Sequence, residues 1–175
     1  MERALPWLAA TGLLLALIVH GLTFLPLNVA IEEFPVIWLL HVGLFVVCIP
    51  FFFSVMQAAR SGLIRSWWSV FPWWAIGVII AAMIYTGANF TSSFVEPSKQ
   101  GKPEIQNGQF VLVSPGQTVH AISEQEYYLR KNYNVRGFSG HWIFFYLIPT
   151  LYFWFGVRPR PSSMRPTGPL IQQDK

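Results

Sequence analysis

Apolar and polar residues along the chain are arranged in long blocks. Three apolar runs of roughly 20 residues, each long enough to cross a ~30 Å hydrocarbon core, occupy residues 5–25, 36–57 and 70–90. A fourth run, shorter and rich in aromatic residues, occupies residues 138–157. The pattern predicts an all-α integral membrane protein with four transmembrane helices.

The polar interval at residues 92–137 separates the third apolar run from the fourth. It begins with a Pro-, Gly- and Lys-rich stretch at 96–104 that has no periodicity and predicts a linker. Residues 109–113 alternate and are rich in Phe and Val, and residues 114–117 (SPGQ) suit a type II turn because Pro presets φ and Gly accepts a positive φ. A β-hairpin is therefore predicted at 109–122.

A helix is predicted directly after this hairpin, at residues 123–136. Ser123 followed three residues later by Glu126 is the signature of a capping box. Gly137 favours the end of this helix, and Ser139 favours the cap of the next one. The interval therefore predicts a small α+β insert, joined to the fourth span by a corner near Gly137.

Composition supports this organisation. Of 175 residues, 53% are hydrophobic and only 11% charged, whereas a soluble domain carries about 25% charged residues. Tryptophans at positions 67, 68, 73 and 74 suit an aromatic belt at a membrane interface. The one cysteine, Cys48, excludes a disulfide framework within the chain. The net charge of +4 comes from residues flanking the apolar runs, so nucleic acid is not an expected partner.

Charges in the short loops predict the orientation of the spans. The arginines fall on one side of the predicted membrane and Glu32 and Glu33 on the other; the arginines are Arg3, Arg60, Arg65, Arg158 and Arg160. Positive loops normally stay in the cytoplasm. We therefore expect a multi-pass protein of the bacterial inner membrane with both termini cytoplasmic. The chain then divides into three spans (1–91), an extracytoplasmic insert (92–137), a fourth span (138–157) and a basic, disordered tail (158–175).

Three histidines, His20, His41 and His141, fall at a similar depth near the outer ends of the predicted spans. Ionisable residues inside a membrane are costly, so each is a functional candidate. Imidazoles at one level can bind haem b or a metal ion. The alternative, which the sequence favours, is that they form hydrogen bonds between helices and brace the bundle.

A second candidate site is the charged and aromatic face of the predicted insert helix. Its residues are of the types that dominate binding energies at interfaces; the candidates are Arg130, Lys131, Tyr133, Arg136 and Phe138. An alternative is that this helix lies on the lipid surface, with its long cationic side chains extended toward the headgroups.

Gly137-Phe138-Ser139-Gly140 resembles the G-x-S-G sequence around the nucleophilic serine of rhomboid intramembrane proteases. Such a serine needs a base within hydrogen-bond reach, for which His41 is the candidate. The resemblance covers four residues, and a rhomboid core has six spans where this chain predicts four. We do not assign the chain to that family.

Three function classes remain open. The first is a non-enzymatic accessory, assembly or immunity-type protein that binds another membrane or periplasmic protein, because an insert of about 45 residues cannot bury much core alone. The second is a small haem b or metal-binding cytochrome or redox subunit. The third is a small transporter, which kinks at Pro50 and Pro149 would permit.

Overall fold

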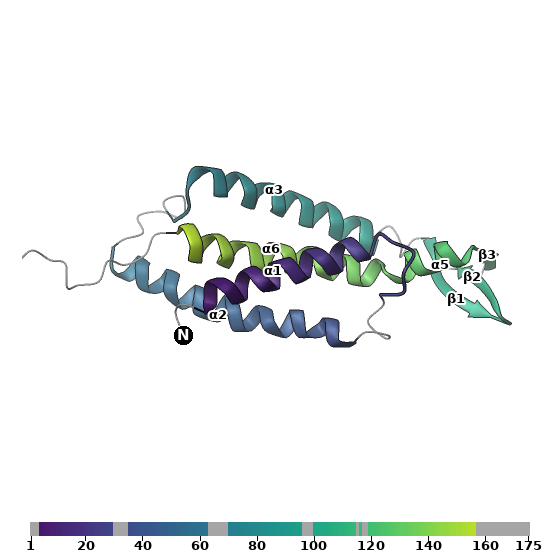
Figure 1. Cartoon of the computed structure of the whole chain (residues 1–175). Helices are drawn as coiled ribbons and strands as arrows, with labels where there is room; N and C mark the ends of the chain where they lie inside the picture. Colours follow the sequence, from purple (N-terminus) through teal and green to yellow (C-terminus); the bar gives the residue numbers. More distant parts are fainter. Residues whose placement is uncertain are drawn as a thin grey trace, which may run out of the picture.

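The computed structural model describes residues 4–29, 35–62, 70–95, 100–114, 116 and 119–156. These residues are mostly helical, with a small sheet at one end of a long helix bundle (Figure 1). The bundle helices are α1 (Leu5–Leu22), α2 (Trp38–Arg60), α3 (Trp73–Phe90) and α6 (Tyr133–Phe155). A 3₁₀ turn, η1 (Pro35–Ile37), precedes α2, and a π-helical turn, η3 (Thr91–Val95), follows α3. The remaining elements are β1 (Lys102–Gln106), β2 (Gln109–Val113), β3 (Val119–Ala121) and α5 (Glu124–Lys131).

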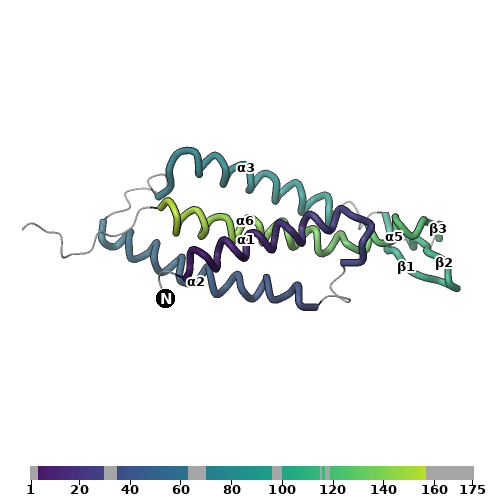
Figure 2. Tube along the Cα trace, viewed as in Figure 1, coloured from purple at the N-terminus to yellow at the C-terminus, as the bar shows by residue number. Residues whose placement is uncertain are grey.

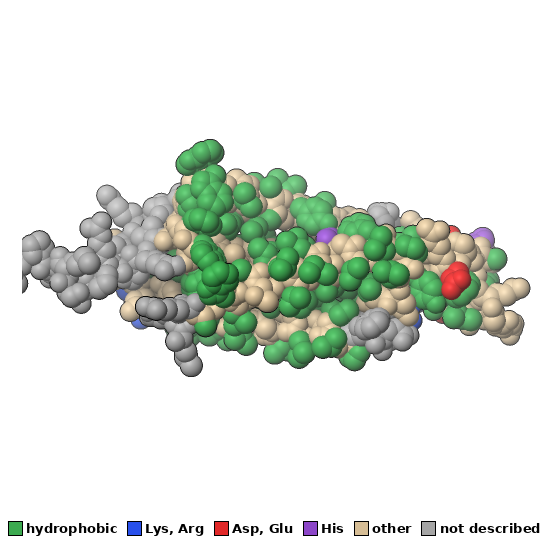
Figure 3. Space-filling view, viewed as in Figure 1, with side chains coloured by type: hydrophobic (Ala, Val, Ile, Leu, Met, Phe, Trp, Pro, Cys, Tyr) green, Lys and Arg blue, Asp and Glu red, His purple; other side chains and the backbone are tan. Residues whose placement is uncertain are grey.

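Three of these helical segments are long and apolar enough to cross a membrane: α1, η1 with α2, and α3 with η3. They coincide with the first three predicted spans. Many of their large side chains are exposed, and apolar side chains cover the visible face along the whole bundle (Figure 3). An apolar exterior of this kind suits contact with lipid rather than water.

Helix α6 lies at the centre of the bundle and packs against α1, α2 and α3 (Figure 2). The start of α1 and the end of α6 lie at the same end of the bundle, opposite the sheet (Figure 1). At that end the rings of Trp7 and Trp154 stack edge to face at 5.1 Å, and the Trp154 Nε1 atom donates to the Pro6 carbonyl at 3.4 Å. Helices α1 and α6 are therefore antiparallel neighbours along their whole length.

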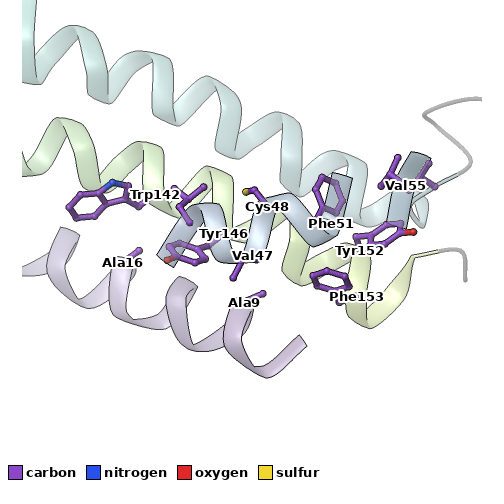
Figure 4. Close-up of a cluster of buried hydrophobic side chains, with 12 residues drawn as sticks. Ala9, Ala16, Val47, Cys48, Phe51, Val55, Trp142, Tyr146, Tyr152 and Phe153 are labelled. Carbon is purple, nitrogen blue, oxygen red and sulfur yellow. The ribbon is translucent and has the colours of Figure 1, made fainter. Parts of the chain in front are cut away.

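The hydrophobic core is built mainly from side chains of α2 and α6, with small residues of α1 packed against them (Figure 4). Tyr146 is its central residue: an added Cβ at Gly12 would meet the tyrosine ring at 2.2 Å, and one at Gly43 would meet the hydroxyl at 2.7 Å. The Tyr146 hydroxyl donates to the Leu40 carbonyl at 2.8 Å. Two glycines thus give room for one aromatic ring to lie between three helices.

The prediction that one helix ends and the next begins near Gly137 is wrong. Helix α6 runs without interruption through residues 137–140, and the chain breaks instead at Asn132, where α5 ends (φ −76°, ψ −8°). An added Cβ at Gly137 would meet the Phe94 ring at 2.0 Å, and one at Gly140 would meet the Asn89 amide at 2.2 Å. These glycines permit close packing of α6 against α3 and η3. The local sequence alone does not distinguish a glycine at a helix contact from a glycine that ends a helix.

The sheet has the order β1-β2-β3, with both neighbouring pairs antiparallel. The predicted hairpin corresponds to β2 and β3, which pair Val111 with Ala121 and Val113 with Val119. The prediction of a linker at 96–104 is wrong for its last residues, because strand β1 begins at Lys102. Asn107 and Gly108, with φ of 53° and 79°, form the tight connection between β1 and β2, as expected for an Asn-Gly hairpin turn.

Helix α5 carries this small sheet. The Phe110 ring lies 5.0 Å from that of Tyr127, and the Arg130 Nη1 atom donates to the Gln100 Oε1 atom at 2.9 Å. Ser123 caps the helix by accepting from the Glu126 backbone N–H at 3.1 Å, as predicted. We refer to residues 100–131 as the head.

Several predicted features lie outside the described residues. They are Arg3, Glu32, Glu33, Arg65, Trp67, Trp68, Pro115, Gln117 and the tail after Gly156, including Arg158 and Arg160. Pro50 and Pro149 both lie inside continuous helices, α2 and α6.

Candidate functional site

Polar side chains from α1, α3 and α6 meet near the end of the bundle that carries the head, and the α3 member, Tyr85, is 44% exposed. His20 on α1 is only 6% exposed, and Ser139 on α6 is fully buried. The Nδ1 atom of His20 lies 2.7 Å from the Ser139 Oγ atom, and its Nε2 atom forms a hydrogen bond with the Tyr85 hydroxyl of α3. One imidazole therefore connects three helices. We call His20, Tyr85 and Ser139 the polar triad.

A neutral imidazole fits the hydrogen-bond partners of the triad. In the tautomer with the proton on Nδ1, the Ser139 Oγ atom accepts from His20 and donates its own proton to the Arg136 carbonyl at 3.1 Å. The Nε2 atom then accepts the proton of the Tyr85 hydroxyl. A neutral imidazole thus satisfies every polar atom of the triad.

Asn89 extends the polar contacts between α3 and α6. Its Nδ2 atom donates to the Arg136 carbonyl at 2.9 Å, and its Oδ1 atom accepts from Ser93 at 3.4 Å. Thr86 donates to the Gly140 carbonyl at 3.3 Å. In the described residues, no buried side-chain nitrogen or oxygen lacks a hydrogen-bond partner.

Arg136 contacts the chain immediately after α1. Its guanidinium donates to the Thr23 carbonyl through Nη2 and to Thr23 Oγ1 through Nε at 3.3 Å. The guanidinium carbon lies 4.2 Å from the Phe24 ring centroid and 5.1 Å from that of Tyr133. These distances are typical of cation–π contacts.

Asn132, fully buried at the break between α5 and α6, binds the same segment. Its Nδ2 atom donates to the Leu27 carbonyl at 2.6 Å, and its Oδ1 atom accepts from the Val29 backbone N–H at 3.2 Å. Turn hydrogen bonds tie Thr23, Phe24 and Leu25 back to α1, and Asn132 adds both a donor and an acceptor to the residues that follow. It therefore fixes the junction of α5 and α6 to the end of α1.

The three histidines do not converge on one site. His41 accepts from the Trp142 Nε1 atom at 3.1 Å, whereas the His141 Nδ1 atom contacts the Gly137 carbonyl at 2.9 Å. His20 uses both ring nitrogens within the polar triad. No group of three or more His, Cys, Asp or Glu side chains with metal-binding geometry occurs in the described part of the chain. The haem or metal hypothesis stays a prediction to be measured.

Ser139 does have a histidine partner, but it is His20 and not the His41 considered from the sequence. A serine bonded to a histidine, itself oriented by a third group, is the arrangement that activates a nucleophile. However, Ser139 is 0% exposed and lies inside a continuous helix, so its Oγ atom is not accessible from the surface of this structure. The triad links helices, as the bracing hypothesis predicted.

The five candidate partner-binding residues occupy different environments. Arg130 is bound to Glu126 at 2.8 Å and to Gln100, both within the head. Phe138 packs against Trp38 and Phe94 inside the bundle. Arg136 is bound to Thr23, Tyr133 lies against Arg136, and the Lys131 ammonium lies 6.0 Å from the Tyr127 ring. They do not form one exposed face.

Sequence reasoning missed Thr23 and Asn132. Thr23 is a polar residue at the end of an apolar run, a signal that was available. No local sequence signal indicated the role of Asn132, because its partners are backbone groups about a hundred residues away.

No protein-family model matches the chain, and no curated protein or solved structure shows significant similarity to it.

Proposed function

We propose that this chain is a four-span membrane protein that acts without catalysis, as an accessory, assembly or immunity-type partner of another membrane or periplasmic protein. Helix α6 serves as the fourth span: at 23 residues it is as long as α2 and is packed among the three apolar helices. The bundle end without the head faces the cytoplasm of a bacterial inner membrane. Arg60 lies at that end of α2 (Figure 1).

The observation that carries the proposal is the apolar surface of the head. Ile105 on β1 is 57% exposed and Val119 on β3 is 48% exposed, on opposite faces of the sheet. Both strands are edges of the sheet, and an exposed edge offers unpaired backbone groups to another chain. In contrast, the polar side chains of the bundle are bonded to one another.

A photo-crosslinking residue at position 105 tests this function in the native membrane. We expect a discrete protein adduct in intact cells, identified by mass spectrometry of the crosslinked band. The matched control is the same residue at Val78, which is 43% exposed on α3 and should react with lipid.

A Val119→Asp substitution provides the second control. Val119 lies on the opposite face and the opposite edge of the sheet from Ile105, because Ile105 pairs with Phe110 and Val119 pairs with Val113. The variant should therefore keep the adduct at position 105 and the helical content of the parent. A chain that forms no protein adduct at position 105 under native expression, and purifies as a single species, contradicts the proposal.

A further inference from the structure

Arg136 is a cation without an acidic partner in the part of the chain that the structure describes. Its Nε and Nη2 atoms donate to uncharged oxygens of Thr23, and no carboxylate of the described residues forms an ion pair with it. The Nη1 group has no hydrogen-bond partner among the same residues. A partly buried guanidinium normally acquires a counter-charge, because leaving it uncompensated is costly.

The position of Arg136 along α6 suggests the source of that charge. Trp154 and Trp7, 44% and 66% exposed, lie together at the end of the bundle without the head, where tryptophans mark a membrane interface. Arg136 lies eighteen residues before Trp154, which corresponds to about 27 Å along a helix. This distance is close to the ~30 Å thickness of a hydrocarbon core. Arg136 is therefore at the level of the opposite headgroups.

Arg136 is partly exposed, and one of the rings against its guanidinium is well exposed. Phe24, which lies 4.2 Å from the guanidinium carbon, is 52% exposed. Tyr133 lies against it from the first turn of α6. The planar guanidinium is thus held in place by Thr23 and two rings, with donors left for an oxyanion. Guanidinium groups bind phosphate oxygens with paired, charge-assisted hydrogen bonds.

We propose that Arg136, with Phe24, Tyr133 and Thr23, forms a binding site for the phosphate of a phospholipid in the leaflet on the head side. The inference rests on the four-span placement but not on a protein partner. The lipid supplies the counter-charge of Arg136, and the two aromatic rings face its glycerol region.

The test compares two lipids with the same acyl chains, phosphatidic acid and diacylglycerol, which differ in the phosphate. Each is titrated into the full-length protein in a neutral maltoside detergent, and bound lipid is counted by native mass spectrometry. We expect one phosphatidic acid to bind at least roughly tenfold more tightly than diacylglycerol, the factor expected for a charged hydrogen bond. The Arg136→Gln variant should lose this preference.

The matched control is Arg130→Gln, which removes a cation of the head that is already paired with Glu126 and should keep the preference. Equal binding of both lipids to the wild type, or a preference retained by Arg136→Gln, overturns the proposal. So does displacement of the lipid by millimolar inorganic phosphate, which would identify a site for the free anion.

Two further measurements complete the design. A Glu32→Gln/Glu33→Gln double variant tests for a carboxylate partner: a phosphate preference that appears only in this variant overturns the proposal. If Arg136→Gln does not fold, photolabelling of the wild type decides. A phosphatidic acid with a diazirine near its headgroup should label residues 23–29 or 133–137, and labelling elsewhere alone contradicts the site.

Discussion

The His20 Nδ1 atom lies 2.7 Å from the Ser139 Oγ atom, across 119 positions of sequence and between two antiparallel helices. Replacing Ser139 by Ala leaves the imidazole N–H buried without an acceptor. Such a group costs about 1–3 kcal/mol. We expect a loss of that size in the free energy of unfolding, measured by reversible denaturation in mixed micelles. Ser92→Ala is the control, because Ser92 is exposed and donates only to the Asn89 carbonyl. Equal stability of the two variants would contradict a bracing role.

Gly12 and Tyr146 give a second prediction. Gly12→Ala places a methyl group 2.2 Å from the Tyr146 ring, whose hydroxyl already lies close to Gly43. Overpacking of this kind typically costs about 1–3 kcal/mol, and the same unfolding assay should report it. Gly21→Ala, on the same helix with nothing within 4 Å of the added Cβ, should be neutral or stabilising by up to about 1 kcal/mol.

Asn132 gives a prediction about local order. Asn132→Ala removes the donor to the Leu27 carbonyl and one of the two acceptors of the Val29 N–H, leaving only the local turn bond from Val29 to the Leu27 carbonyl at 3.0 Å. We expect amide hydrogen exchange at Val29 to accelerate by roughly tenfold or more, consistent with about 1.4 kcal/mol or more of lost protection. The exposed neighbour Asn134, replaced by Ala, should leave exchange at Val29 unchanged. If Val29 exchanges at the same rate in both variants, Asn132 does not hold this segment.

The visible absorption spectrum of the purified protein tests the haem hypothesis. Both ring nitrogens of His20 are occupied, and His41 and His141 contact different partners. We therefore expect no Soret band in the oxidised protein or after dithionite reduction. A Soret band that shifts on reduction and disappears in His41→Ala or His141→Ala would support a redox function.

Cysteine labelling tests the topology. In a Cys48→Ala background, which has no other cysteine, Glu104→Cys on β1 should react with a membrane-impermeant maleimide in cells whose outer membrane is permeable to it. Gln57→Cys, exposed near the opposite end of α2, should react only after lysis. The reverse pattern would place the head in the cytoplasm.

The three apolar spans and the cap at Ser123 could be predicted because each depends on nearby residues alone. The same local rules misplaced the corner at Gly137, since a helix stop and a close helix contact both select glycine. Strand β1 could have been predicted: Asn107-Gly108 is a strong turn signal, but Pro103 and the lysines nearby favoured a linker. Pro103 is tolerated because β1 is an edge strand.

The contacts within the polar triad could not be predicted from neighbouring residues, because its members are far apart in the sequence. Membrane depth placed His20, His41 and His141 at one level, but the direction in which each side chain points depends on how the helices are rotated. Helix rotation is determined by packing of the kind seen between Gly12 and Tyr146. The sequence therefore indicated which residues were costly to bury and did not indicate which of them would meet.

Asn132 has a mechanical consequence. The residue stands between the helix that carries the sheet and the helix at the centre of the bundle, and its side chain is bonded to the chain that leaves α1. A force applied to the head should therefore act on both α1 and α6, because the side chain of Asn132 joins the start of α6 to the residues that follow α1.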